Sequence, residues 1–170
     1  MKLQPTIKIP SSKSVPRPDV SLKDYRKIIR SMKKDLESAP DQRIYRSRLY
    51  CHNYILVLAN TGIRKGEMRD VRWKDISTAK DVHGTSTVII NVSGKTGARL
   101  VVANPSTAEY LKRIFEFRTG ELGCKPPKDE LVFCKPNGQP IGEMKKPFER
   151  LLGVTDTLFV DGQKRTIYSL

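Results

Sequence analysis

Thr61-Gly62-Ile63-Arg64-Lys65-Gly66-Glu67-Met68, with Val71-Arg72-Trp73-Lys74-Asp75-Ile76 after it, is the stretch at which this chain changes from helical to extended periodicity. An apolar run ends at the Thr-Gly turn, and an arginine follows at once. A short amphipathic helix then carries a glutamate, and β-branched and aromatic residues follow. The stretch therefore predicts a long helix, a turn, a short helix and a strand, in that order.

Two helices are predicted before this junction. Ser21 makes a good N-cap, and apolar residues recur at helical spacing up to Pro40, which predicts a first helix over residues 21–38. A second helix is predicted over residues 41–59. Its apolar block at residues 54–58 indicates a central, mostly buried element.

After the junction the pattern predicts a small sheet. A short helix at residues 65–71 leads into three segments rich in β-branched residues, bounded by Gly, Ser and Asp. These predicted strands cover residues 71–76, 87–92 and 99–103. Because their connections are short, we expect antiparallel pairing.

The rest of the chain is predicted to be mostly helical. Asn104-Pro105 opens a third long helix that Gly120 terminates, and residues 130–134 form a short extended segment. A fourth apolar helical pattern follows and contains Pro147, so that helix either begins or kinks there.

Together these elements predict an α+β fold that is mainly helical, with a small three-stranded antiparallel sheet. Residues 1–20 hold four of the chain's eleven prolines and show no periodic apolar face, so they are predicted to be a linker. Residues 21–170 are predicted to form one domain, long enough to bury a hydrophobic core.

The composition favours a polyanionic partner and gives no sign of a cofactor. Lys and Arg number 32 against 18 Asp and Glu, for a formal net charge of +14. Such a charge favours nucleic acid, although basic charge alone does not make a binding site. Three cysteines without a C-x-x-C pair and two scattered histidines predict no metal site. No apolar run of membrane-spanning length and no leader is seen, so we expect a cytoplasmic protein.

Arg64 is the first candidate for chemistry. A guanidinium stays charged at working pH, and its planar fork of donors suits two oxygens of one phosphate. The alternative is a surface arginine that solvates a helix end. Glu67 lies three residues on, on the same helical face, and is predicted to be a structural partner of a cation rather than a base.

Lys95 is the second candidate, in Ser93-Gly94-Lys95-Thr96-Gly97 between two predicted strands. A lysine on a hairpin can donate a proton to a leaving oxygen, which an arginine cannot do. The Gly-Lys-Thr string is not a nucleotide-binding loop, because Ile89 stands where that motif needs a glycine. The alternative is a solvated hairpin lysine.

The stretch from Thr61 to Ile76 resembles the first arginine box of the tyrosine recombinases, the phage integrase family, with every defining position filled. Gly94-Lys95-Thr96 with Arg99 resembles the lysine hairpin of that family. The resemblance implies a recombinase catalytic domain that acts on double-stranded DNA with other integrase protomers, through a 3′-phosphotyrosyl link and without metal or nucleotide. It gives Arg64 the role of transition-state stabiliser and Lys95 that of general acid.

The resemblance is incomplete near Tyr168-Ser169-Leu170. The family's second box reads H-x-L-R-H, and Tyr168 stands at its first histidine. Tyr168 has that role or simply packs in the core, and both interpretations stay open. The second arginine, the histidine after it and the nucleophilic tyrosine have no match. We therefore expect a truncated catalytic domain, inactive alone, or alternatively a non-catalytic DNA-binding or regulatory protein of recombinase descent.

Three further cations are candidates for contact with DNA. Arg99, Lys164 and Arg165 are predicted to contact the DNA backbone or to form part of a solvated face. An RNA-binding module is weakly supported, because the aromatic residues are not interleaved with the basic ones as a base-stacking surface requires.

Overall fold

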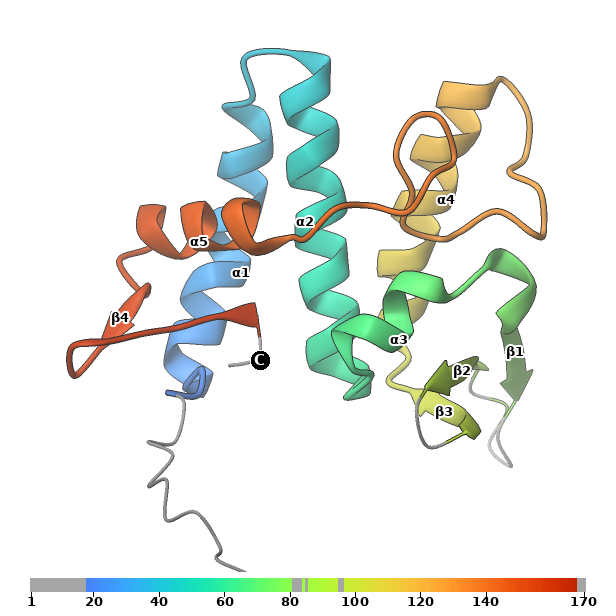
Figure 1. The fold of residues 1–170 in the computed structure, drawn as a ribbon, viewed down its shortest axis with the longest axis horizontal. Helices are drawn as coiled ribbons and strands as arrows, with labels where there is room; N and C mark the ends of the chain where they lie inside the picture. Colours follow the sequence, from blue (N-terminus) through green and yellow to red (C-terminus); the bar gives the residue numbers. More distant parts are fainter. Residues whose placement is uncertain (1–17, 81–83, 85, 95–96, 168–170) are drawn as a thin grey trace, which may run out of the picture.

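The computed structural model describes residues 18–80, 84, 86–94 and 97–167. Figure 1 shows a mainly helical molecule with a small sheet at one side. The predicted linker lies almost wholly outside the described residues. The elements, in chain order, are α1 (Leu22–Glu37), α2 (Gln42–Thr61), α3 (Lys65–Asp70), the 3-10 turn η1 (Trp73–Asp75), β1 (Ile76–Lys80), β2 (Ser86–Gly94), β3 (Gly97–Ala103), α4 (Ser106–Leu122), α5 (Lys145–Val154), β4 (Phe159–Val160) and β5 (Gln163–Lys164).

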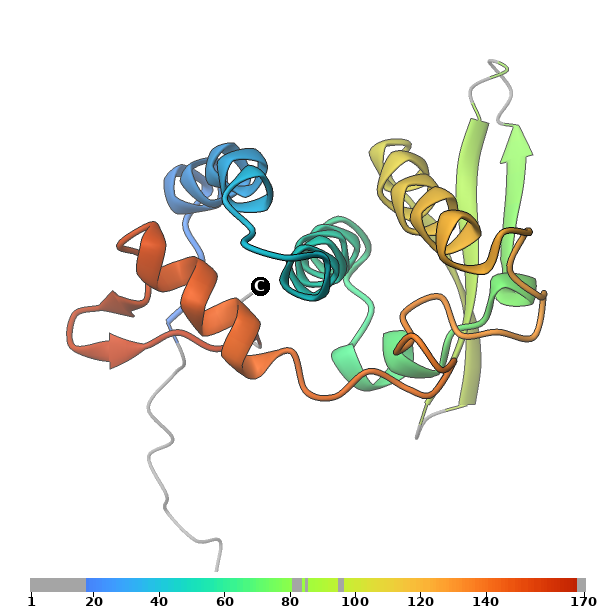
Figure 2. The ribbon, with the colours of Figure 1, turned by 90° about the horizontal axis from the view of Figure 1, so that it is seen from above.

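Helix α2 is the central element, as its apolar sequence predicted. The Asp41 carboxylate caps it by accepting a hydrogen bond of 2.7 Å from the Ile44 amide. At its other end Gly62 has φ +65°, a left-handed conformation that costs glycine nothing. Figure 2 shows α2 between α1 and α5 on one side and α4 and the sheet on the other.

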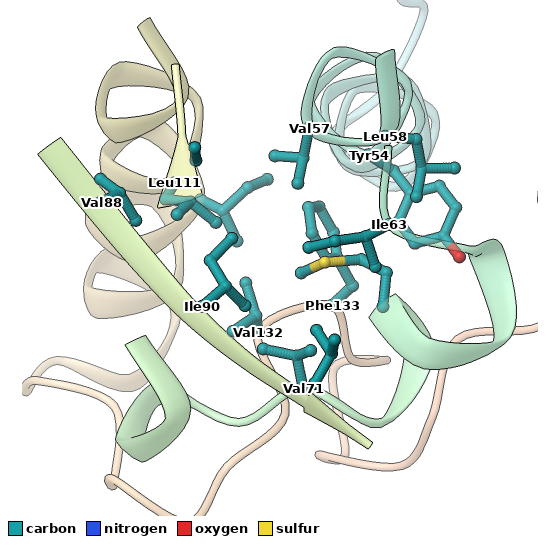
Figure 3. Close-up of a cluster of buried hydrophobic side chains, with 14 of the residues drawn as sticks. Tyr54, Val57, Leu58, Ile63, Val71, Val88, Ile90, Leu111, Val132 and Phe133 are labelled. Carbon is teal, nitrogen blue, oxygen red and sulfur yellow. The ribbon is translucent and has the colours of Figure 1, made fainter. Parts of the chain in front are cut away.

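The core forms two clusters, one on each side of α2. The first joins α2 and α4 to strand β2 and to Val132 and Phe133, and Ile63 lies within it (Figure 3). The second joins α2 to α1 and α5 through Ile28, Ile55 and Phe148, all fully buried. Burial on both sides explains why α2 has ten consecutive buried residues, 49–58.

The sheet has the order β1-β2-β3, and both pairings are antiparallel as predicted. Ile90 lies opposite Ile76 on one side and Val101 on the other. The β2 residues Val88, Ile90 and Val92 turn inward to the first cluster. Leu100 and Val102 of β3 face outward and are exposed.

The prediction of a strand at residues 71–76 is wrong, because η1 occupies its middle and β1 begins only at Ile76. The Asp75 carboxylate accepts a hydrogen bond of 2.9 Å from the Arg72 amide, and this closes a tight turn. Residues 130–134, predicted to be a short extended segment, form no strand: the chain bends there and pairs only through isolated bridges, one of them from Leu131 to Arg72.

Two helix ends also differ from their predictions. Helix α4 runs through Gly120 and ends at Gly123, which has φ +69°. Helix α5 begins two residues before Pro147, whose missing N–H falls in the first turn, where no intrahelical acceptor is required. None of the described helices combines the length and apolar character needed to cross a membrane.

Candidate phosphate-binding groove

Arg64 lies immediately before α3, on the turn that Gly62 begins. Its amide donates a hydrogen bond of 3.0 Å to Glu67 Oε2, so the backbone is fixed by a carboxylate three residues on. The side chain is 70% exposed. The local fold therefore holds the Arg64 backbone rigidly and leaves most of its guanidinium facing solvent.

Glu67 is the buried centre of this turn. Its carboxylate is only 6% exposed and accepts a hydrogen bond of 2.8 Å from Arg99 Nη2 of strand β3. Arg64 Nη1 lies 3.9 Å from its other oxygen. Burial alone would raise the pKa of Glu67, but the hydrogen bonds from Arg64 and Arg99 and their positive charges lower it below its ordinary value. The predicted role of Glu67 as a partner of cations is confirmed.

The end of the β2–β3 hairpin lies against this carboxylate. Gly94 and Gly97 are the last described pair of the ladder. A Cβ built on Gly94 would lie 3.0 Å from Glu67 Oε1, so a side chain there would meet the buried group. Lys95 follows Gly94 in sequence but lies outside the described residues, so its chemical role remains a prediction.

A groove of about 670 Å³ lies where three distant segments of the chain meet. The Gly62–Glu67 turn forms one wall, Ser93 and Gly94 form another, and Ile167 contributes from the C-terminal segment. Tyr168 comes next in sequence and also lies outside the described residues. Of the predicted site residues, the structure therefore places Arg64 in the groove, together with the chain neighbours of Lys95 and Tyr168.

A second cavity of about 710 Å³ adjoins the first and shares Lys65, Gly66 and Ile167 with it. Arg69 and Lys145 add positive charge to its lining. The Glu143 carboxylate also lines it and lies 3.7 Å from Lys65 Nζ. The two cavities together carry more cationic than anionic side chains around the Arg64 turn.

Arg165 anchors the segment that brings Ile167 to the groove. It is 2% exposed and donates hydrogen bonds to the Asp24 carboxylate at 2.8 Å and to the Asp19 and Thr157 carbonyls. Its predicted contact with DNA is wrong, because the side chain is buried. Lys164 pairs with Glu149 of α5 at 3.0 Å and stays partly exposed.

The sequence did not identify the contacts that build this groove. Arg99 and Arg165 are two of 32 basic residues, and their carboxylate partners lie far away in the chain. For Gly94, the sequence predicts a place in a hairpin but not its close approach to Glu67. No group of three or more potential metal ligands is found within the described ranges.

Comparison with known proteins places the fold. The sequence matches no protein-family model and none of the curated proteins. Among solved structures, the XerH site-specific recombinase bound to a palindromic difH substrate, a post-cleavage complex, is similar with a TM-score of 0.63 and 18% sequence identity, over 85% of this chain and 38% of that one.

Two further recombinase structures agree. XerH bound to difH substrate in a pre-cleavage complex gives a TM-score of 0.62 and 17% identity, over 89% of this chain and 41% of that one. The XerA recombinase gives a TM-score of 0.56 and 19% sequence identity, over 91% of this chain and 48% of that one. The chain thus spans less than half the length of these recombinases. The likeness to the tyrosine recombinases, seen first in the arginine box, is therefore confirmed at the level of the fold.

Proposed function

We propose that this chain supplies part of the catalytic centre of a tyrosine-type DNA strand transferase, a site-specific recombinase that acts on double-stranded DNA. The observation that carries the proposal is the exposed Arg64 guanidinium at the groove where the first arginine box, the β2–β3 hairpin and Ile167 meet. A formal charge of +14 supports a polyanionic substrate. The XerH structures are complexes with difH substrate before and after cleavage.

The proposed reaction is attack on a DNA phosphodiester. A tyrosine hydroxyl loses its proton, and its oxygen forms a bond to the phosphorus. The bond between the phosphorus and the 5′ oxygen breaks, which leaves the 3′ phosphate covalently linked to the tyrosine. Arg64 stabilises the charge that develops on the phosphoryl oxygens. Lys95 gives the proton to the departing 5′ oxygen. Tyr168 stands at the first-histidine position of the second box, where its hydroxyl would add a hydrogen-bond donor.

The 170 residues contain no match to the second-box arginine and histidine, nor a tyrosine after Tyr168. The proposal therefore includes that this polypeptide by itself binds duplex DNA but does not cleave it. Loss of one pre-placed donor slows such catalysis by about 10²- to 10³-fold, and several are absent from these residues. Cleavage would need the second-box arginine and histidine and the nucleophilic tyrosine. Recombination would need other protomers on the same DNA, and we expect both reactions to take place in the cytoplasm.

A second candidate function is a non-catalytic DNA-binding or regulatory protein of recombinase descent. The same groove and the same charge favour it. The two candidates differ in what Lys95 does. In a complete recombinase built on this domain, Lys95→Ala should block cleavage and spare binding, whereas a regulatory protein has no cleavage to block.

DNA binding tests what both candidates share. We expect the affinity for a duplex oligonucleotide to fall steeply as salt rises, and Arg64→Ala to lower the log–log salt slope by about 1, as for the loss of one phosphate contact. Arg43→Ala is the control, because Arg43 is exposed in the first turn of α2, about 27 Å along that helix from Thr61, the end nearest in sequence to Arg64. An affinity for duplex DNA that does not change with salt, or an equal change of the salt slope in Arg64→Ala and Arg43→Ala, would refute the proposal.

A further inference from the structure

Arg99 contacts the Arg64 turn from strand β3. Its guanidinium donates to Glu67 Oε2 at 2.8 Å, across 32 residues of sequence. The Arg99 side chain is 45% exposed, whereas the carboxylate that it meets is 6% exposed. An exposed ion pair would contribute little, but a buried carboxylate depends on its donors because water cannot replace them.

Gly94 brings the partner strand to the same carboxylate. A Cβ on Gly94 would lie 3.0 Å from Glu67 Oε1 and 3.3 Å from Cγ, both tighter than ordinary packing. Arg99 of β3 lies opposite Val92 of β2, two residues before Gly94. Both strands of the hairpin therefore contact Glu67, one by a hydrogen bond and one by close packing.

Glu67 in turn fixes the turn that holds Arg64. Its Oε2 accepts both the Arg64 amide at 3.0 Å and the Arg99 guanidinium at 2.8 Å. One oxygen atom thus joins the backbone of the first arginine box to the second strand of the hairpin. A shift of the hairpin away from α3 would cost the Arg99 bond and leave a buried charge with one donor fewer.

We propose that Arg99 is a positioning residue, which holds the end of the β2–β3 hairpin against the Arg64 turn so that both meet the same phosphate. This rests on the proposed function. Arg99 acts through Glu67.

Amide hydrogen exchange of the DNA-free protein tests the positioning. Arg99→Ala should speed exchange at residues 92–94 and Gly97 by about tenfold, the effect of losing one charge-assisted hydrogen bond, with α4 unchanged. Arg99→Lys should restore most of the protection. Arg113→Ala is the matched control, because its side chain is 47% exposed and paired with Glu109 on α4. No change in Arg99→Ala, or equal acceleration throughout the protein, would overturn the proposal.

Adding a short duplex oligonucleotide links the contact to function. In the wild type, NMR signals of the Arg64 Nε–H and the Gly94 amide should both shift as duplex is added. In Arg99→Ala the Arg64 signal should respond and the Gly94 signal should not, and Arg99→Lys should recover both. A Gly94 response that survives in Arg99→Ala overturns the positioning role. Absence of an Arg64 response in the wild type refutes the proposed function instead, and the exchange experiment still decides the role of Arg99.

Discussion

Arg64 and Glu67, three residues apart, have opposite environments for one physical reason. The Glu67 carboxylate is buried, and its Oε2 accepts hydrogen bonds from the Arg64 amide and the Arg99 guanidinium, so these two donors hold it without a hydrogen bond from the Arg64 side chain. The Arg64 guanidinium stays 70% exposed, at 3.9 Å from that carboxylate. A charge held in place by its backbone, with its donors facing a groove, is well arranged to receive an anion.

Gly94 is predicted to be sensitive to a single added methyl group. Gly94→Ala should lower the free energy of unfolding by about 1–3 kcal/mol, because the new Cβ crowds the buried Glu67 carboxylate. Gly66→Ala is the control, since a Cβ there meets nothing within 4 Å and alanine favours a helix by about 1 kcal/mol. Thermal unfolding of the two variants checks this, and equal stability would contradict the packing at Gly94.

Sequence alone could predict that Arg64 lies at the start of a short helix and that Glu67 pairs with a cation, because both depend on spacing within one short segment. It could not predict that Gly94 and Arg99 would meet Glu67, since those contacts depend on how the hairpin docks on α3. Nor could it separate Arg165, which is buried, from Lys164 beside it, which is not. Burial of a charged side chain is decided by partners distant in sequence.

At the scale of elements, Asp35 ties together three helices. Its carboxylate accepts two hydrogen bonds from Arg150 of α5, at 2.7 and 2.6 Å, and lies 2.8 Å from His52 Nε2 of α2. Burial alone would raise the pKa of Asp35, but the Arg150 hydrogen bonds and the surrounding positive charges lower it. Asp35 of α1 therefore links α1 to both α2 and α5 through contacts of its carboxylate.

Removing that charge should loosen the helices. Asp35→Asn is expected to lower the free energy of unfolding by about 3–5 kcal/mol, because Arg150 and His52 lose a buried partner. Glu37→Gln, on the same helix with an exposed partner in Lys33, should change stability by less than about 0.5 kcal/mol. Chemical denaturation of both variants measures the difference. Similar midpoints would show that the Asp35 cluster is not structural.

The C-terminal segment should depend on Arg165 in the same way. Arg165→Ala removes hydrogen bonds to the Asp24 carboxylate and to the carbonyls of Asp19 and Thr157, so we expect a loss of about 2–4 kcal/mol in the free energy of unfolding. Lys164→Ala removes only a partly exposed ion pair and should cost less than about 1 kcal/mol. Thermal unfolding distinguishes them, and an Arg165 variant as stable as the Lys164 variant would contradict the anchoring role.

The whole molecule is predicted to lose stability in acid in two stages. Burial lowers the pKa of His52, although the nearby Asp35 carboxylate opposes this shift. As the pH drops below about 6.5, His52 is therefore protonated in the unfolded chain before it is protonated in the fold, and the stability of the fold decreases. The pKa values of Asp35 and Glu67 are lowered in the fold, and so is that of Glu121 on α4, where the raising effect of burial is outweighed by hydrogen bonds from Arg46 and Arg118. The stability that these carboxylates contribute is therefore present above about pH 4 and lost below it.

Unfolding temperatures between pH 7.5 and pH 3 measure both stages. His52→Gln should flatten the curve between about pH 7 and pH 5 and leave the lower stage intact. A wild-type unfolding temperature that rises on acidification would contradict the assigned signs. If the loss of stability between about pH 7 and pH 5 were unchanged in His52→Gln, it would belong to another titrating group.

At this scale the sequence was most informative where periodicity was strong. The apolar α2, the three-stranded antiparallel sheet and the overall α+β class were predicted correctly, because each depends on a long hydrophobic pattern. Errors arose at residues 71–76 and at Gly120, where one side-chain hydrogen bond or one backbone conformation sets an element's end. The two-residue strands β4 and β5 were too short to leave a pattern.

A crystal structure of the protein bound to duplex DNA would show whether Arg64 and the β2–β3 hairpin meet one phosphate. We expect one DNA phosphate in the groove, with the Arg64 guanidinium within about 2.7–3.2 Å of its oxygens and the end of the β2–β3 hairpin beside the same phosphate. Duplex lying on another face, with Arg64 turned to solvent and the groove empty of phosphate, would contradict it.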